Sequence, residues 1–340
     1  MEFNRTELMP GVFLSHLRSD KFKTACMSVT LLTQLRRETA AMNAVIPFVL
    51  RRGTTRYSDM EQLSRRMDEL YGAAVEPVVR RIGEIQCIGF YGSFPEPDYL
   101  PGGEALLGDT CALMAQLLLD PVTRGGLLLP QYVDSEREKL LDIIRSRMND
   151  KRSYALTRCI EEMCCYEDFA VSRFGSESEA ENIHYKKLTR HYRELIQTCP
   201  VEIFYCGKTD FKAVSAAMRD AFSAMPRGEI DYDIGTDLRM NAVEDHVRFV
   251  EEEMDVTQGK LVLGFRLGEC MEEPDIPALY VFNAVYGSGA TSKLFMNVRE
   301  KLSLCYYASS AVYPHKGIML VSSGIEFDKL DAARDEILAQ

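Results

Sequence analysis

Long apolar runs are missing from this sequence. No window approaches 18 consecutive apolar residues, about the length that a membrane-spanning helix needs. The first five residues also lack the order of a basic segment followed by an apolar segment that marks a secretory signal. Both absences argue against a membrane-spanning or exported protein, and we expect a cytoplasmic one.

Positive charge is scarce relative to negative charge. The chain carries 40 Lys and Arg against 51 Asp and Glu, a formal net charge of −11. Such a surface repels nucleic-acid phosphates and anionic membranes, and we therefore expect neither as a main partner.

A spaced cysteine framework is also missing. The chain has ten cysteines, but Cys164 and Cys165 are direct neighbours, and a chain of this size has a core of its own. We expect all ten to be reduced thiols and none to be a catalytic nucleophile.

Histidine is scarce and unpaired. No two histidines lie three or four residues apart, so no helix presents a His pair to a metal ion. The nearest two, His184 and His191, are two helical turns apart, and we interpret each as a surface or interface residue. The sequence also has no Cys-x-x-Cys pair and no Gly-x-Ser-x-Gly elbow. From the residues alone, no enzyme site assembles. The five histidines are His16, His184, His191, His246 and His315.

What the sequence does contain is a large globular core. With 46% hydrophobic and 27% charged residues in 340, the length favours two domains. The expected elements of the first part mix strands and helices, which indicates the α+β class. They are a strand at 24–35, a helix at 40–50 containing Pro47, a helix capped by Ser58 and Glu61 that ends at Gly72, strands within 74–94, helices to about 195 including one from Asp134 or Ser135, a strand at 201–207 and a helix at 211–223.

The stretch 226–241 mixes Pro, Gly and charge without a period, which indicates a linker. We therefore expect a first domain at 1–225, a linker at 226–245 and a second domain at 246–340. Both parts run strand, helix, strands, helix, which suggests a structural duplication. The elements expected in the second part are strands at 246–252 and 260–267, a helix at 276–287, a Gly/Ser turn at 287–292, a helix from Lys293, strands at 305–313 and 317–324, and an amphipathic segment at 328–340.

One segment of the second part carries a specific resemblance. Residues 280–306 contain, in order, a helix, a Gly-rich turn, Ser-x-Leu-Phe, Arg-Glu-Lys and Leu-x-Tyr. This order resembles the second-domain hallmark of the pitrilysin/insulinase (M16-type) zinc peptidases. Residues 255–265 resemble that domain's opening strand, and Gly53-Thr54, 70–73 and 201–207 resemble the first-domain pattern. The resemblance implies two homologous α/β-sandwich domains, each a largely antiparallel sheet with helices packed on one face.

The first domain departs from the family at its zinc motif. The family places His-x-x-Glu-His on the helix before Gly-Thr, and here its two His positions fall on Ala44 and Phe48 and its Glu on Pro47. A further Glu ligand, counted from Glu138, falls near Arg145. The resemblance therefore implies a member without a metal of its own, inactive when alone.

Two residues of the family's functional set remain. Arg299 and Tyr306 match an Arg/Tyr pair that members supply from the second domain to a facing zinc site. An Arg fork and a phenol can donate hydrogen bonds to a peptide carbonyl or an oxyanion. The alternative is a surface Arg and a sheet tyrosine without such a role.

The resemblance thus implies a non-catalytic subunit, like that of a processing peptidase, which closes a chamber for unfolded peptides. Zinc is expected only in a homologous partner subunit with an intact motif. The alternatives are an inert structural or peptide-binding scaffold of the same fold and, less favoured, a peptidase with unusual ligands. Since the family's second domain is usually about as long as its first, we also expect a truncated second domain with exposed apolar surface and self-association.

Overall fold

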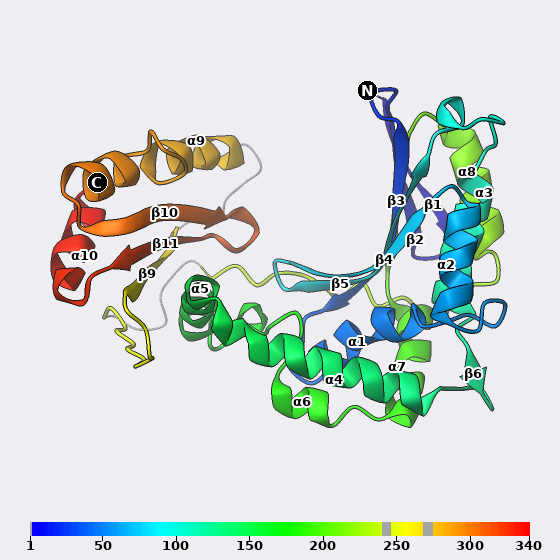
Figure 1. Ribbon diagram of the computed structural model, residues 1–340, viewed down its shortest axis with the longest axis horizontal. Coiled ribbons are helices and arrows are strands. Elements are labelled where there is room, and N and C mark those ends of the chain that lie inside the picture. Colours follow the sequence, from blue (N-terminus) through cyan, green and yellow to red (C-terminus); the bar gives the residue numbers. More distant parts are fainter. Residues whose placement is uncertain (1, 240–245, 268–274) are drawn as a thin grey trace. The chain divides into compact units, whose positions relative to one another are not determined.

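The computed structural model describes residues 2–239, 246–267 and 275–340 (Figure 1). Cys270 and the expected linker residues 240–245 lie outside the described residues. The chain forms two compact units, the first made of Met1–Ile144 and Val171–Gly235 and the second of Arg145–Ala170 and Thr236–Gln340. Within the described ranges, no helix combines the length and the apolar character needed to cross a bilayer.

A six-stranded sheet forms the centre of the first unit, in the spatial order β1-β2-β8-β3-β5-β4. Neighbouring strands are antiparallel except β2 and β8, which are parallel. The predicted largely antiparallel sheet is confirmed. Its strands are β1 (Glu2–Met9), β2 (Val12–Arg18), β3 (Thr24–Gln34), β4 (Ala74–Ile82), β5 (Ile85–Pro95) and β8 (Val201–Gly207), and a separate hairpin joins β6 (Thr123–Arg124) to β7 (Leu127–Leu128).

Helices cover one face of this sheet. Burial alternates along β3, where Ala25, Met27 and Val29 are buried and Cys26 and Ser28 are half-exposed, because successive side chains point to opposite faces. Helices α3 and α8 pack against each other and against strands of the sheet. The helices are α1 (Ala40–Leu50), α2 (Met60–Glu69), α3 (Leu107–Leu119), α4 (Pro130–Ser146), α6 (Glu177–Glu181), α7 (Tyr185–Thr198) and α8 (Phe211–Phe222).

The second unit has a three-stranded antiparallel sheet in the order β10-β11-β9. These strands pair in the same order and orientation as β4, β5 and β3 of the first unit. Helix α5, which comes from a segment between two parts of the first unit, packs on β9 and β11. The elements are α5 (Lys151–Met163), β9 (Gly259–Arg266), α9 (Ile276–Tyr286), the π-helical η5 (Leu294–Lys301), β10 (Cys305–Tyr313), β11 (Ile318–Ile325) and α10 (Leu330–Ala339), with short 3₁₀ turns that include η3 (Asp168–Ala170) and η6 (Pro314–Lys316).

A buried ionic cluster fastens the α5 segment to this sheet. The Glu167 carboxylate lies 2.5 Å from Lys316 Nζ and also accepts from the Arg266 guanidinium. Arg266 donates further to the Met163 carbonyl at 3.1 Å, and Lys316 to the Asp237 carbonyl. Burial alone would raise the pKa of Glu167, but hydrogen bonds from Arg266 and Lys316 outweigh it and lower that pKa.

Helix α9 leaves much of its apolar surface uncovered. Leu279 and Tyr286 are buried, whereas Tyr280, Val281 and Phe282 are 54%, 65% and 48% exposed. An apolar helix with so little burial is unusual in a soluble fold. The expected exposure of apolar surface on the second unit is present at this helix.

Three sequence expectations about elements are wrong. Helix α2 is capped by Asp59, which accepts from the Gln62 amide at 2.9 Å, and not by Ser58 with Glu61. Helix α4 begins at Pro130, a residue suited to a first turn, and not at Asp134 or Ser135. Residues 246–252 form no strand.

The division into domains 1–225 and 246–340 stays a prediction. The chain passes into the second unit between Gly235 and Thr236, inside the expected linker. Residues 145–170, however, pack with the second unit.

Candidate functional site

Three of the four positions that match the family's zinc ligands and catalytic Glu lie on α1. Ala44 and Pro47 are buried and Phe48 is half-buried, and none of their side chains offers a donor atom to a metal. The fourth, Arg145, lies exposed in the last turn of α4 and carries a positive charge. These residues do not fit a zinc ion, which requires Cys, His or carboxylate ligands.

A buried hydrogen-bond network occupies the same helix. Asn43 Nδ2 donates to Gln86 Oε1 at 2.8 Å, and His191 Nε2 donates to Asn43 Oδ1 at 2.6 Å. Gln86 Nε2 donates to the carbonyls of Ala40 and Arg173 at 3.0 and 2.7 Å. Burial lowers the pKa of His191, so the neutral ring is favoured. His191, expected at the surface or at an interface, is half-buried and ties α7 to α1.

An acidic residue near the end of α1 also forms ion pairs. Glu136 of α4 is 5% exposed, and its carboxylate lies 3.3 Å from Arg52 and 2.9 Å from Lys139. The Arg52 guanidinium lies 5.0 Å from the centre of the Tyr132 ring. Both ion pairs hold the carboxylate inside the protein.

Arg299 lies in η5 of the second unit. Its guanidinium carbon lies 4.5 Å from the centre of the Phe295 ring, and Nε lies 3.6 Å from the Glu300 carboxylate. The side chain keeps 40% of its surface exposed. Stacking on an aromatic ring restricts the guanidinium while its outer edge stays accessible.

Tyr306 lies in β10, beyond the turn that follows η5. Its side chain is 51% exposed, and its hydroxyl donates to Glu326 Oε1 at 3.3 Å. Lys329 lies 2.8 Å from the same carboxylate, and its hydrogen bond is the main cause of the lowered pKa of Glu326. Arg299 and Tyr306 therefore both lie at the surface of the second unit, each with its own neighbours.

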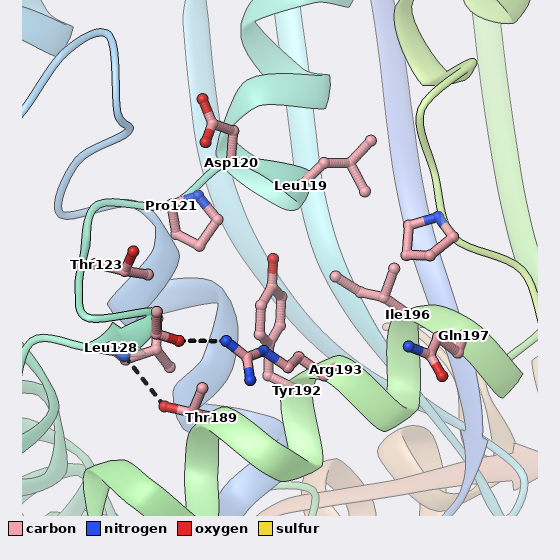
Figure 2. Close-up of a pocket in the computed structure, with 12 residues that line it drawn as sticks. Leu119, Asp120, Pro121, Thr123, Leu128, Thr189, Tyr192, Arg193, Ile196 and Gln197 are labelled. Carbon is pink, nitrogen blue, oxygen red and sulfur yellow. Dashed lines mark hydrogen bonds between the residues drawn. The ribbon is translucent and has the colours of Figure 1, made fainter.

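A cavity of about 220 Å³ opens beside α7 in the first unit (Figure 2). Three of its polar groups bond within the protein: Tyr192 donates to the Leu118 carbonyl at 2.7 Å, the Leu128 amide to Thr189 at 3.1 Å, and Arg193 to the Gly126 carbonyl. Burial raises the pKa of Tyr192 well above its usual value, so the phenol stays protonated. No local pattern in the sequence indicates this cavity, because its walls come from separate segments.

Across the part of the chain that the structure describes, no group of three or more His, Cys, Asp or Glu could hold a metal ion.

Comparisons with known proteins agree with this geometry. A family model described as "Peptidase M16 inactive domain" matches residues 182–340. The "Probable inactive metalloprotease YmfF" of Bacillus subtilis (strain 168) is 32% identical over 340 residues, which cover 99% of this chain and 78% of that protein.

Two solved structures show the same fold. A conserved protein from Enterococcus faecalis V583 has a TM-score of 0.88 at 24% identity, with 99% of this chain and 78% of that chain covered. A peptidase M16 inactive domain from Pseudomonas fluorescens has a TM-score of 0.79 at 14% identity, with 100% and 79% covered.

Proposed function

The chain belongs to the peptidase M16 family as an inactive member, and from this membership we propose that it is the non-catalytic subunit of a two-chain zinc peptidase. A homologous partner with an intact His-x-x-Glu-His motif would hold the zinc. This chain would close the chamber that receives unfolded peptides and would supply Arg299 and Tyr306 to the partner's site. We place this assembly in the cytoplasm.

The observation that carries the proposal is a contrast between the two units. In the first, Ala44, Pro47 and Phe48 leave no group that could bind zinc or activate water. In the second, the Arg and Tyr of the family pattern are both retained and both exposed. The chain thus lacks the metal-binding residues of the family but keeps its two hydrogen-bond donors. This combination suits a non-catalytic subunit beside a catalytic partner.

The chemistry assigned to Arg299 is charge stabilisation. Attack on a peptide carbonyl develops negative charge on its oxygen, and a positioned guanidinium donates to that oxyanion more strongly than to the ground-state carbonyl. The ring of Phe295 supports the guanidinium from one face, which reduces the reorganisation needed at the moment of reaction.

Tyr306 would act as a second donor. Its hydroxyl bonds to Glu326 across 3.3 Å, a long and half-exposed contact that a substrate carbonyl can replace. Lys329 would keep Glu326 satisfied after that exchange, since it lies 2.8 Å from the carboxylate.

The test is peptide cleavage by the chain alone, by the zinc-motif homologue from the same genome alone, and by their mixture, with zinc measured in each sample. We expect activity and zinc in the mixture, and no zinc in this chain alone. In the mixture, Arg299→Ala should lower kcat by roughly 100-fold, as for loss of an oxyanion donor. Tyr306→Phe should also lower kcat, and both variants should leave the Kd between subunits unchanged.

Matched variants separate catalysis from assembly. Arg334, paired with Asp331 at 2.8 Å, and Tyr280 are an arginine and a tyrosine that are also exposed on the second unit. Arg334→Ala and Tyr280→Phe should leave kcat unchanged. Glu326→Gln removes the carboxylate that the Tyr306 hydroxyl bonds to but leaves that hydroxyl in place. This variant should therefore retain more activity than Tyr306→Phe. Unchanged turnover in Arg299→Ala and Tyr306→Phe would contradict the proposed roles and favour the inert scaffold.

A further inference from the structure

Two cysteines meet across neighbouring strands of the first unit. Cys26 of β3 and Cys206 of β8 are direct partners in the antiparallel register of these strands. Both are free thiols, and both lie on the half-exposed face of the sheet. The sequence separates them by almost the whole first unit, so only the fold brings them together.

The backbone register sets the spacing of the pair. The Leu32 amide donates to the Pro200 carbonyl at 2.9 Å, which marks Leu32 and Pro200 as a hydrogen-bonded pair. Counting by twos along the uninterrupted register, Cys26 and Cys206 also form such a pair, with α-carbons about 5.5 Å apart. That separation falls within the range of roughly 4.4–6.8 Å that a disulfide spans.

The two side chains leave the same face of the sheet from directly opposed positions, so their thiols are neighbours. Burial and the neighbouring thiol raise the pKa of Cys206, so exchange should be slow at neutral pH and faster in mild alkali.

We propose that Cys26 and Cys206 are a dithiol site that a small disulfide such as oxidised glutathione converts into a cross-strand disulfide. One protein thiolate attacks a sulfur of oxidised glutathione, forms a mixed disulfide and releases one glutathione thiolate. The second protein thiolate attacks the protein sulfur of that mixed disulfide and releases the other glutathione. Two protein thiols lose two protons and two electrons, and one oxidised glutathione becomes two reduced molecules.

Several other described cysteines are less suited to this exchange. Burial raises the pKa of Cys87 and Cys159 to about 11 and that of Cys111 to about 12, which disfavours their thiolates. The adjacent Cys164 and Cys165 differ in access, since the first is fully buried and the second is exposed. Both cysteines of the pair are half-exposed, so reduced glutathione can reach the bond and reduce it again.

The experiment uses the full chain in buffers of oxidised and reduced glutathione at about pH 8, where thiolates begin to form. Free thiols are then blocked with iodoacetamide and the protein is digested without reduction. We expect a linked peptide pair that contains Cys26 and Cys206, formed in oxidising buffer and lost on return to reducing buffer. The same cross-link should slow unfolding of the first unit in urea, because it ties β8 to β3.

Single variants provide the controls. Cys26→Ser and Cys206→Ser should each abolish the linked peptide and leave a glutathione adduct on the remaining cysteine, while circular dichroism confirms the fold. Cys165→Ser, an exposed cysteine outside the pair, should leave the linked peptide unchanged. The proposal is overturned if the wild-type chain shows only glutathione adducts, only a Cys164–Cys165 bond, or alkylation of both cysteines throughout. These outcomes do not depend on a peptidase partner.

Discussion

Replacing Glu167 by Gln should strongly destabilise the second unit. The Glu167 side chain is fully buried, and its carboxylate neutralises Lys316, also fully buried, and Arg266, whose side chain is 7% exposed. The amide keeps the shape but not the charge, so two cations remain in the interior without a counter-ion. Loss of one partner of a buried ion pair costs about 3–5 kcal/mol, and we expect about 3 kcal/mol because the amide oxygen still accepts one hydrogen bond.

Hydrogen exchange measures this effect unit by unit. A loss of about 3 kcal/mol corresponds to roughly a 100-fold rise in the opening constant of the amides in β9 and β11. The amides of β3 and β5 in the first unit should be much less affected. Glu162→Gln is the matched control: Glu162 pairs with Arg158 at 2.7 Å but is 33% exposed, so its loss should cost less than about 1 kcal/mol.

The acid sensitivity of the second unit gives an independent check. The folded-state pKa of Glu167 is lowered, so its stabilisation is present above the unfolded-state pKa of about 4.3 and is lost as pH falls through the folded pKa. Glu167→Gln should remove this part of the acid destabilisation. Adding Lys316→Met should recover stability, because one orphaned cation is then gone. Equal effects of Glu167→Gln and Glu162→Gln would refute the reasoning.

Three further outcomes are expected. Burial lowers the pKa of His191 below its unfolded value of about 6.5, so the first unit should lose stability as pH falls from about 7 toward the folded pKa. In urea melts, the free energy of unfolding of His191→Gln should therefore depend less on pH. An unchanged pH dependence would contradict this role. Asp59→Ala should cost about 1 kcal/mol of thermal stability and Ser58→Ala much less, because Asp59 caps α2; equal losses would favour Ser58. Sedimentation should show self-association that Val281→Glu weakens, because α9 exposes apolar surface; a clean monomer at high concentration would exclude this.

Local patterns in the sequence predicted most elements of the fold. The strand at 24–35 and the helix at 40–50 are present almost as expected, because β-branched runs and a buried apolar helix are strong local signals. The errors lie where two local signals compete. Ser58 and Asp59 are both residue types that cap helices well. Pro130 suits the first turn of a helix, so α4 begins about one turn before its apolar stripe.

The predicted sites depended on a family motif, and groups formed by distant residues were missed. Ala44 and Arg299 could be named because the motif counts positions along the chain. The Glu167 cluster joins residues about 100 and 150 positions apart, and the pairing of Cys26 with Cys206 depends on strand register. Neither leaves a periodic pattern or a fixed spacing in the sequence, so only the tertiary structure reveals them.

The discontinuous second unit has a consequence for the order of synthesis. Helix α5 leaves the ribosome with the first unit, long before β9 and β11, the strands on which it packs, have been translated. Until then, apolar residues such as Ile160 and Cys164 lack their native partners on β11. The nascent first unit can close early around its own sheet, whereas the second must wait for distant segments and should fold late and more slowly. Chaperones that bind exposed apolar segments would therefore find their target in α5 while translation continues.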